Sequence, residues 1–245
     1  MKGLLYKEWC LQRKTIFTFV ALALVFSLLG ILMFISMKCG NLKGWQTENP
    51  ESAQVFLSTF TYVPYIFMLL ASQVCNAAVC SDYETGWMKY AYTLPVTGKV
   101  AVGTRYLFGC IAMVTGIIYG LVNALAIYAF AGLSFDMNVI KYMLIILLGI
   151  VLSYSIFMPV SFKFKKKRTV STISAVVFAF IYFGAMGVLA YCMEVYDEEV
   201  LNVMSAKLKD FCDVLAWFVP FISVAVLIIS FGASVKIYQR REKIC

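Results

Sequence analysis

The sequence predicts an all-α integral membrane protein with six transmembrane helices, and three observations support this class. Of the 245 residues, 62% are hydrophobic and only 14% are charged, whereas a soluble domain is about half apolar and about one quarter charged. Six separate stretches supply the roughly 20 apolar residues that a helix needs to cross the hydrocarbon core. Lys and Arg gather on one side of these stretches, as they do in cytoplasmic loops.

The six helices use nearly the whole chain, so residues 1–245 are predicted to form a single membrane domain. Helices are expected because lipid offers no hydrogen-bond partner to an exposed backbone N–H or C=O group. The first stretch is too long for a signal-peptide core, so it is predicted to be a retained span. The predicted spans are about 15–37, 55–79, 106–131, 141–160, 170–193 and 214–235.

The basic residues predict that both the N and C termini are cytoplasmic. Sixteen of the 21 Lys and Arg residues fall on the side that holds both termini and the loops after the second and fourth spans. This orientation accounts for the net charge of +8, so no nucleic acid partner is expected. It places the acidic residues Glu194, Asp197, Glu198 and Glu199 outside the cell.

Several chemistries are disfavoured by what the sequence lacks. There is no histidine and no CxxC pair among the eight cysteines, so no metal or haem site is expected. Cys192 and Cys212 flank one predicted external loop, and their pairing is left open. Inside the spans the charged residues are Arg105 and Lys141, both at an edge, whereas proton-coupled transporters keep ionisable groups near the midplane.

Two patterns within the spans have more than one interpretation. Pro64 and Pro220 lie inside spans and Pro159 lies near the end of one; each is either a tolerated kink or a hinge. Gly116 and Gly120 have the small-xxx-small spacing that allows close helix approach. That contact is either within the chain or between two chains.

The loop between the second and third spans is predicted to contain a short amphipathic helix. Ser81 and Glu84 have capping-box spacing, and Asp82 adds negative charge in the first turn. Pro95 ends the run. From the residues alone, this helix either lies at the lipid headgroups or docks a cytoplasmic protein. One helical face would carry Trp87, Tyr90, Ala91 and Leu94.

The N-terminus shows a weaker version of the same pattern. Leu4, Leu5 and Trp9 share one helical face, and the intervening residues are mostly polar or basic. The sequence therefore predicts an interfacial helix that lies on the inner leaflet before the first span. Anionic membrane lipid would attract its charges, which belong to Lys2, Lys7, Arg13 and Lys14.

Two segments of the sequence resemble a known family. The opening residues 1–9 and the stretch Tyr83-Glu84-Thr85-Gly86-Trp87, followed by Thr93-Leu94-Pro95-Val96, resemble the ABC-2 type transporter permease family. The resemblance covers the whole layout of the chain. Within the family it is greatest to small six-span bacterial permeases, the membrane subunits of exporters for phenol-soluble modulins and related amphipathic peptides.

The resemblance implies a multi-pass protein of the bacterial cytoplasmic membrane that works with partners. Two cytoplasmic ABC ATPase subunits would bind ATP and Mg²⁺, and a second permease chain, the same or a paralogue, would pair with this one. The N-terminal interfacial helix would be the family's elbow helix, with Leu4, Leu5 and Trp9. No substrate-contacting residue can be transferred. The cytoplasmic coupling helix would carry Asp82, Glu84, Gly86, Trp87, Tyr90, Leu94 and Pro95.

The predicted function is therefore export of an amphipathic or hydrophobic substrate, of the peptide class, driven by a separate ATPase. The chain is not expected to be an enzyme, because Thr97-Gly98-Lys99-Val100 lacks the upstream glycine and the following Ser or Thr of a Walker A motif. A secondary transporter or channel is the alternative, and gradient-driven flux without nucleotide would identify it. A membrane-embedded enzyme is disfavoured by the absence of histidine, and bound metal would revive it.

Overall fold

The structure is a computed structural model of the chain. It describes residues 2–39, 50–91, 96–164, 166, 168–177, 179 and 198–242. The named elements are α1 (Lys2–Cys39), α3 (Pro50–Leu70), the 3₁₀ turn η1 (Ala71–Gln73), α4 (Val74–Glu84), α5 (Trp87–Ala91), α6 (Gly98–Ala131), α7 (Met137–Lys163) and α9 (Glu198–Glu242). The described part of the chain is thus helical, as predicted.

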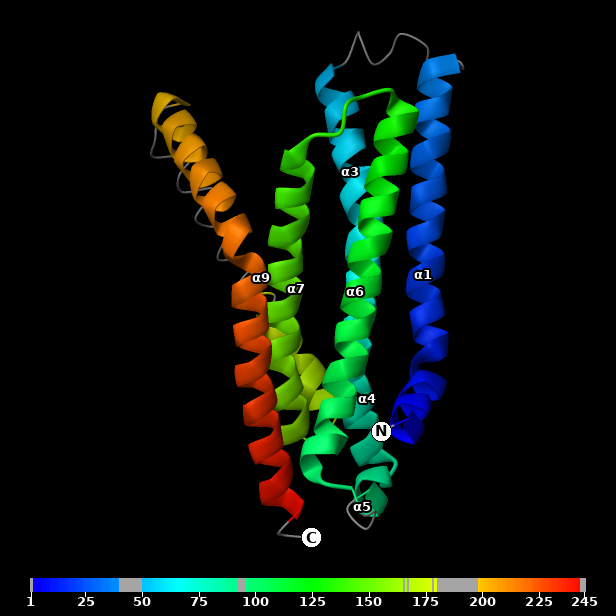
Figure 1. The fold of residues 1–245 in the computed structure, drawn as a ribbon, viewed down its shortest axis with the longest axis vertical. Coiled ribbons are helices and arrows are strands. Elements are labelled where there is room, and N and C mark those ends of the chain that lie inside the picture. The colour runs from blue at the N-terminus through cyan, green and yellow to red at the C-terminus, as the bar shows by residue number, and fades with distance from the viewer. Residues whose placement is uncertain are drawn as a thin grey trace.

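Helices α1, α3, α6 and α7 run along one common direction, and the first half of α9 tilts away from them (Figure 1). Five described stretches are long and apolar enough to cross a membrane: Lys2–Cys39, Ser52–Glu84, Gly98–Ala131, Met137–Lys163 and Asp213–Arg240. They contain the first four predicted spans and the last. The prediction of an all-helical, multi-pass membrane protein is confirmed.

The two ends of the bundle differ in what they hold. The start of α1, helix α5 and the last turns of α9 lie at one end, called the α5 end below; the α6–α7 connection lies at the other, called the loop end (Figure 1). Helix α7 ends at the α5 end and α9 begins at the loop end. Six crossings need one further span between α7 and α9, and this span would run from the α5 end to the loop end. The predicted fifth span, 170–193, falls mostly outside the described residues. The count of six and the cytoplasmic termini therefore stay predictions.

The predicted interfacial helix is not a separate element. Residues Lys2–Cys39 form one continuous α-helix of 38 residues, with no break between the N-terminal segment and the first span. The physical reason lies in Lys7, which was predicted to face anionic lipid, and in its neighbour Glu8. Both instead contact charged residues of other helices, so the first turns of α1 are held against the bundle.

The α6–α7 connection shows how local sequence sets helix ends. Gly132 has a φ of 72°, a left-handed conformation that favours glycine and closes a helix. Its N–H donates to the Ala129 carbonyl at 3.2 Å. Asp136 then caps α7, because its carboxylate accepts the backbone N–H of Asn138 at 3.0 Å. A short link of this kind makes α6 and α7 neighbours that run in opposite directions.

The predicted Gly116–Gly120 contact lies within the chain. A Cβ atom on Gly116 would meet the Cδ2 of Leu69 at 3.0 Å, and one on Gly120 would overlap the ring of Tyr65. Both partners belong to α3, so the two glycines let α3 and α6 approach closely. Pro64 lies inside α3, which continues past it to Leu70.

Large apolar side chains cover the outside of the bundle. Trp217 and Phe221 of α9 are 74% and 76% exposed, and α1 and α6 show similar outward faces. In water such surfaces would be a liability, whereas in a bilayer they are the faces that contact lipid. The structure thus carries its polar chemistry inside the bundle and at its ends.

Candidate functional site

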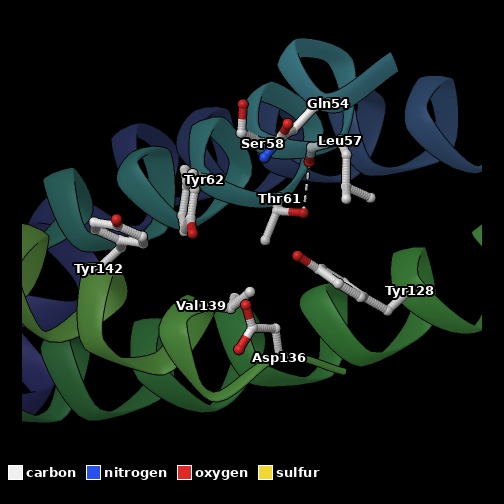
Figure 2. Close-up of a pocket in the computed structure, with 9 residues that line it drawn as sticks. All are labelled: Gln54, Leu57, Ser58, Thr61, Tyr62, Tyr128, Asp136, Val139 and Tyr142. Atoms are coloured by element: carbon white, nitrogen blue, oxygen red, sulfur yellow. Dashed lines mark hydrogen bonds between the residues drawn. The ribbon is translucent and has the colours of Figure 1, made fainter. Parts of the chain in front are cut away.

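Two pockets lie at opposite ends of the bundle. The larger one, about 290 Å³, is at the loop end between α3, the end of α6 and the start of α7 (Figure 2). The smaller one, about 30 Å³, is at the α5 end and is lined by residues of α1, α5, α6, α7 and α9. The charged residues Lys7, Glu8 and Arg105 are part of the lining of the smaller pocket, and they belong to the candidate site.

Four charged residues from three helices meet at the α5 end and are called the charge cluster. Lys7 Nζ of α1 lies 2.6 Å from the Asp82 carboxylate of α4. Arg105 of α6 contacts the same Asp82 oxygen through its Nη2. The Arg105 Nε lies 3.5 Å from Glu8 of α1. The two positive and two negative charges balance, and the Glu8, Asp82 and Arg105 side chains are at most 8% exposed.

Neutral polar groups extend the charge cluster into the bundle. Gln12 donates to the Glu8 carboxylate at 2.8 Å, and its own carbonyl oxygen accepts the Cys75 thiol at 3.6 Å. The Tyr154 hydroxyl donates to the Arg105 backbone carbonyl at 3.2 Å. The cluster is therefore connected to α7 as well as to α1, α4 and α6.

Because the charge cluster is buried, the stability of the bundle depends on how its charges are paired. A charge removed from water is tolerated only if it is paired and hydrogen-bonded, and removing one partner of a buried pair costs about 3–5 kcal/mol. Glu8, Asp82 and Arg105 therefore have to keep their mutual positions when the bundle moves. In consequence, the cluster fixes how α1, α4 and α6 are aligned along the bundle.

The α4–α5 junction brings an aromatic residue onto this cluster. Helix α4 ends at Glu84, and Gly86 turns the chain with a φ of 77°, which disfavours any residue with a side chain. No atom lies within 4 Å of a Cβ built there, so conformation rather than space selects glycine. Trp87 then opens α5, and the Lys7 Nζ lies 4.6 Å from its ring centroid, within cation–π range.

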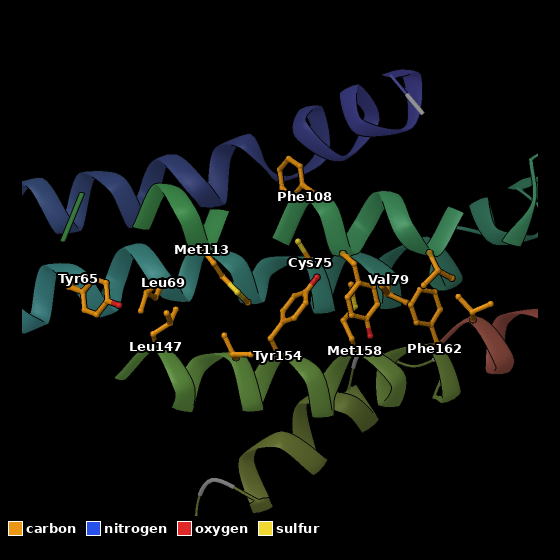
Figure 3. Close-up of a cluster of buried hydrophobic side chains, with 14 of the residues drawn as sticks. Tyr65, Leu69, Cys75, Val79, Phe108, Met113, Leu147, Tyr154, Met158 and Phe162 are labelled. Carbon is orange, nitrogen blue, oxygen red and sulfur yellow. The ribbon is translucent and has the colours of Figure 1, made fainter. Parts of the chain in front are cut away.

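A continuous apolar core joins the two ends of the bundle (Figure 3). Tyr65 near the loop-end pocket donates its hydroxyl hydrogen to the Met143 carbonyl at 3.0 Å. Phe162 closes the core at the α5 end, with the Arg105 guanidinium 5.6 Å from its ring centroid. Because a close-packed core transmits displacement, movement at the charge cluster is not confined to that end. Between these residues lie Leu69, Met113, Leu147, Tyr154 and Met158.

Helix α9 is attached to this core through hydroxyl groups. The Tyr106 hydroxyl of α6 lies 2.6 Å from that of Ser230 and 2.8 Å from that of Ser234. Ser230 in turn donates to the Ser155 carbonyl of α7 at 2.6 Å. Hydrogen bonds of this kind are typical connections between membrane helices, and here they join α6, α7 and α9 through Tyr106, the residue that follows Arg105 of the charge cluster.

The structure places the residues predicted for the coupling helix in two different elements. Asp82 and Glu84 belong to the last turn of α4, Gly86 forms the junction, and Trp87 and Tyr90 belong to α5. The side chain of Tyr90 is outside what the structure describes, as are Leu94 and Pro95. The predicted Ser81–Glu84 capping box is wrong, because both residues lie inside α4. The second span continues as helix beyond its apolar part, so no helix begins at Ser81.

The residues predicted for the elbow helix point in different directions. Leu5 packs against the apolar core, and Leu4 lines the small pocket beside Trp87. Trp9 is 43% exposed and contacts Phe17 further along the same helix. The N-terminal turns of α1 thus contact the bundle through Leu4 and Leu5 and expose Trp9.

Sequence reasoning missed Lys7, Glu8 and Arg105 as members of one site. Two signals point to them in retrospect. Glu8 is the one acidic residue among the first 47 residues, and Arg105 is the basic residue at the start of the third span. Helices α4 and α6 run in opposite directions from one loop, so Asp82 and Arg105 are brought to the same level. The position of α1 could not be read from the sequence.

Metal and disulfide chemistry have no support in the part of the chain that the structure describes. There, no group of three or more His, Cys, Asp or Glu residues is arranged to hold a metal ion. Cys192 and the side chain of Cys212 lie outside the described residues, so their pairing stays open.

Comparison with known protein families identifies the chain. The family of ABC-2 family transporter proteins matches residues 3–239, a range that runs from the first turn of α1 to the last turns of α9. Among curated proteins, the comparison finds no match. The resemblance seen in residues 1–9 and 83–96 is confirmed over nearly the whole length. With its continuous apolar helices and its polar α5 end, the chain belongs to the ABC-2 transporter family.

Proposed function

We propose that this chain is the permease subunit of an ATP-binding cassette exporter in the bacterial cytoplasmic membrane. Its substrate would be amphipathic or hydrophobic and of the peptide class, moved out of the cell. The chain would not hydrolyse ATP, because it lacks a Walker A motif. ATP and Mg²⁺ would be bound by two cytoplasmic ABC ATPase subunits, and a second permease chain, the same or a paralogue, would complete the transporter.

The observation that carries this proposal is the contact between Trp87 and the charge cluster. Helix α5 is a five-residue element at the tip of the bundle, and its first residue lies against Lys7. Lys7 is paired with Asp82, which is paired with Arg105. A displacement of α5 by a docked ATPase would therefore act on α1, α4 and α6 together, which is what an externally driven permease needs.

A binding experiment tests the docking role of α5. The full chain is co-expressed with its cognate ATPase, and we expect Trp87→Ala and Tyr90→Ala to reduce co-purification and ATP-dependent export. Trp217→Ala is the matched control, because Trp217 is 74% exposed on α9 and away from α5. Normal ATPase binding and stimulation by both α5 variants would reject the assignment.

A topology experiment tests the side of the membrane on which α5 lies. An epitope tag inserted between residues 85 and 95 should be reached by antibody only after the cells are permeabilised. A tag that is labelled on intact cells would place α5 outside and would exclude docking of a cytoplasmic ATPase.

The charge cluster also supports a second candidate, a secondary transporter or channel that works without an ATPase. Glu8 and Asp82 are buried ionisable groups of the kind that proton-coupled transporters use, although such transporters keep them near the midplane and the charge cluster lies at the α5 end. This candidate predicts proton-driven flux in vesicles without nucleotide, lost in Glu8→Gln. Flux that requires the ATPase and ATP would reject it.

A further inference from the structure

The charge in the lining of the loop-end pocket is negative and comes from one carboxylate. One carboxylate, that of Asp136, lies beside the hydroxyl groups of Tyr62 and Tyr128, and no Lys or Arg among the described residues lines the pocket. In Figure 2 the hydroxyl of Tyr128 points across the hollow toward α3, and Asp136 lies below it. The lining therefore offers acceptor oxygens and a negative charge, which suits a cation.

Aromatic rings form a second part of the lining. Tyr62 and Tyr142 meet edge to face, with ring centroids 6.4 Å apart at 78°. Tyr128 is held in the same way by Phe135, at 5.5 Å and 69°. Rings fixed by such pairs do not need to be ordered when a ligand enters. Three tyrosines around one hollow resemble the aromatic surroundings that bind quaternary ammonium groups.

The carboxylate is also held in place before any ligand arrives. Asp136 caps α7 with both oxygens, accepting the backbone N–H of Asn138 at 3.0 Å and its side-chain amide at 2.9 Å. A helix N-terminus stabilises the ionised form of such a residue. Lys141, about one turn further along α7, is paired with Asp213 of α9 at 3.1 Å, so its charge is directed toward α9.

The size and chemistry of the pocket limit the ligand. A volume of about 290 Å³ is near the lower end for ligand sites, so the pocket fits a small ion rather than a whole amphipathic peptide. Ca²⁺ and Mg²⁺ favour sites with several oxygen ligands, carboxylates among them, whereas the described lining contains one carboxylate. We propose that the loop-end pocket is a binding site for a small organic ammonium ion, held by Asp136 and by the rings of Tyr62, Tyr128 and Tyr142.

This proposal does not depend on the ATPase partnership, and binding to the permease chain alone tests it. The full chain is placed in nanodiscs of phosphatidylglycerol, a lipid without an ammonium group, and choline is titrated by calorimetry. The matched probe is 3,3-dimethylbutan-1-ol, which has the shape of choline without its charge. We expect choline to bind at least roughly tenfold more tightly than the neutral probe, because only the cation interacts with the carboxylate and the ring faces.

Two variants connect the binding to this pocket. Asp136→Asn keeps a residue that caps helices well and removes the charge; Tyr142→Leu removes one ring from a partly exposed position. We expect each to weaken choline binding by roughly tenfold, with thermal unfolding unchanged. Asp210→Asn, which changes an exposed acidic residue of α9 outside the pocket, should bind choline as the original chain does. Equal binding of both probes, no binding of choline, or full binding by Asp136→Asn and Tyr142→Leu would overturn the proposal.

Discussion

The two ends of the bundle hold polar groups in opposite ways. At the α5 end, charges from α1, α4 and α6 neutralise one another and leave a pocket of about 30 Å³. At the loop end, tyrosines and one carboxylate surround a pocket of about 290 Å³. At the α5 end the opposite charges are paired with one another, whereas the loop end leaves room for a ligand.

This comparison connects packing with function. A neutral, buried ion network resists any sliding of the helices that would separate its charges, so the α5 end is suited to passing on a displacement. A pre-formed hollow lined by polar groups is suited to recognition. The apolar core between them, from Phe162 to Tyr65, connects the two without charge. Three substitutions test whether the ends differ as described.

The largest effect is expected from breaking the charge cluster. Arg105→Met leaves Glu8 and Asp82 with Lys7 as their one remaining cation in the cluster, and we expect the free energy of unfolding to fall by about 3–5 kcal/mol. The measurement is reversible unfolding in detergent–SDS mixtures. The double variant Arg105→Met with Asp82→Leu restores charge balance. Its loss of unfolding free energy should be smaller than the sum of the losses in the two single variants. Strict additivity would mean that the cluster does not act as a unit.

An intermediate effect is expected where α3 and α6 touch below the loop-end pocket. A Cβ on Gly120 would overlap Tyr65 and lie 2.6 Å from the Met143 Cε, so Gly120→Ala should destabilise the chain by about 1–3 kcal/mol. Gly149→Ala is the control, because nothing lies within 4 Å of its Cβ position. The same unfolding assay compares them. Equal stability of the two variants would show that the helices are not in close contact.

The smallest effect is expected at the loop end's own ion pair. Lys141 and Asp213 are 3.1 Å apart, but their side chains are 28% and 37% exposed. Partly exposed pairs contribute about 0–1 kcal/mol, so Lys141→Met should change the free energy of unfolding by no more than that. If Lys141→Met lost as much unfolding free energy as Arg105→Met, the ion pairs at the two ends would contribute equally, and the proposed difference between the ends would be wrong.

The sequence anticipated local features better than spatial ones. Gly86 and Trp87 were singled out from a short motif, and the structure places them at a real helix junction. Ser81 was misread, because capping-box spacing also occurs by chance inside a helix that continues. Gly116 and Gly120 were recognised as a close contact, but the sequence could not say that their partner is α3 of the same chain.

The sequence by itself determined the membrane class, most of the spans and the family, because apolar length and short motifs are properties of neighbouring residues. Only the tertiary structure decided that Glu8 meets Arg105, that Lys7 lies between Asp82 and Trp87, and that three tyrosines surround one hollow. These residues are separated by tens of positions along the chain. Whether they come into contact depends on how the helices pack side by side, and a local sequence pattern does not predict that packing.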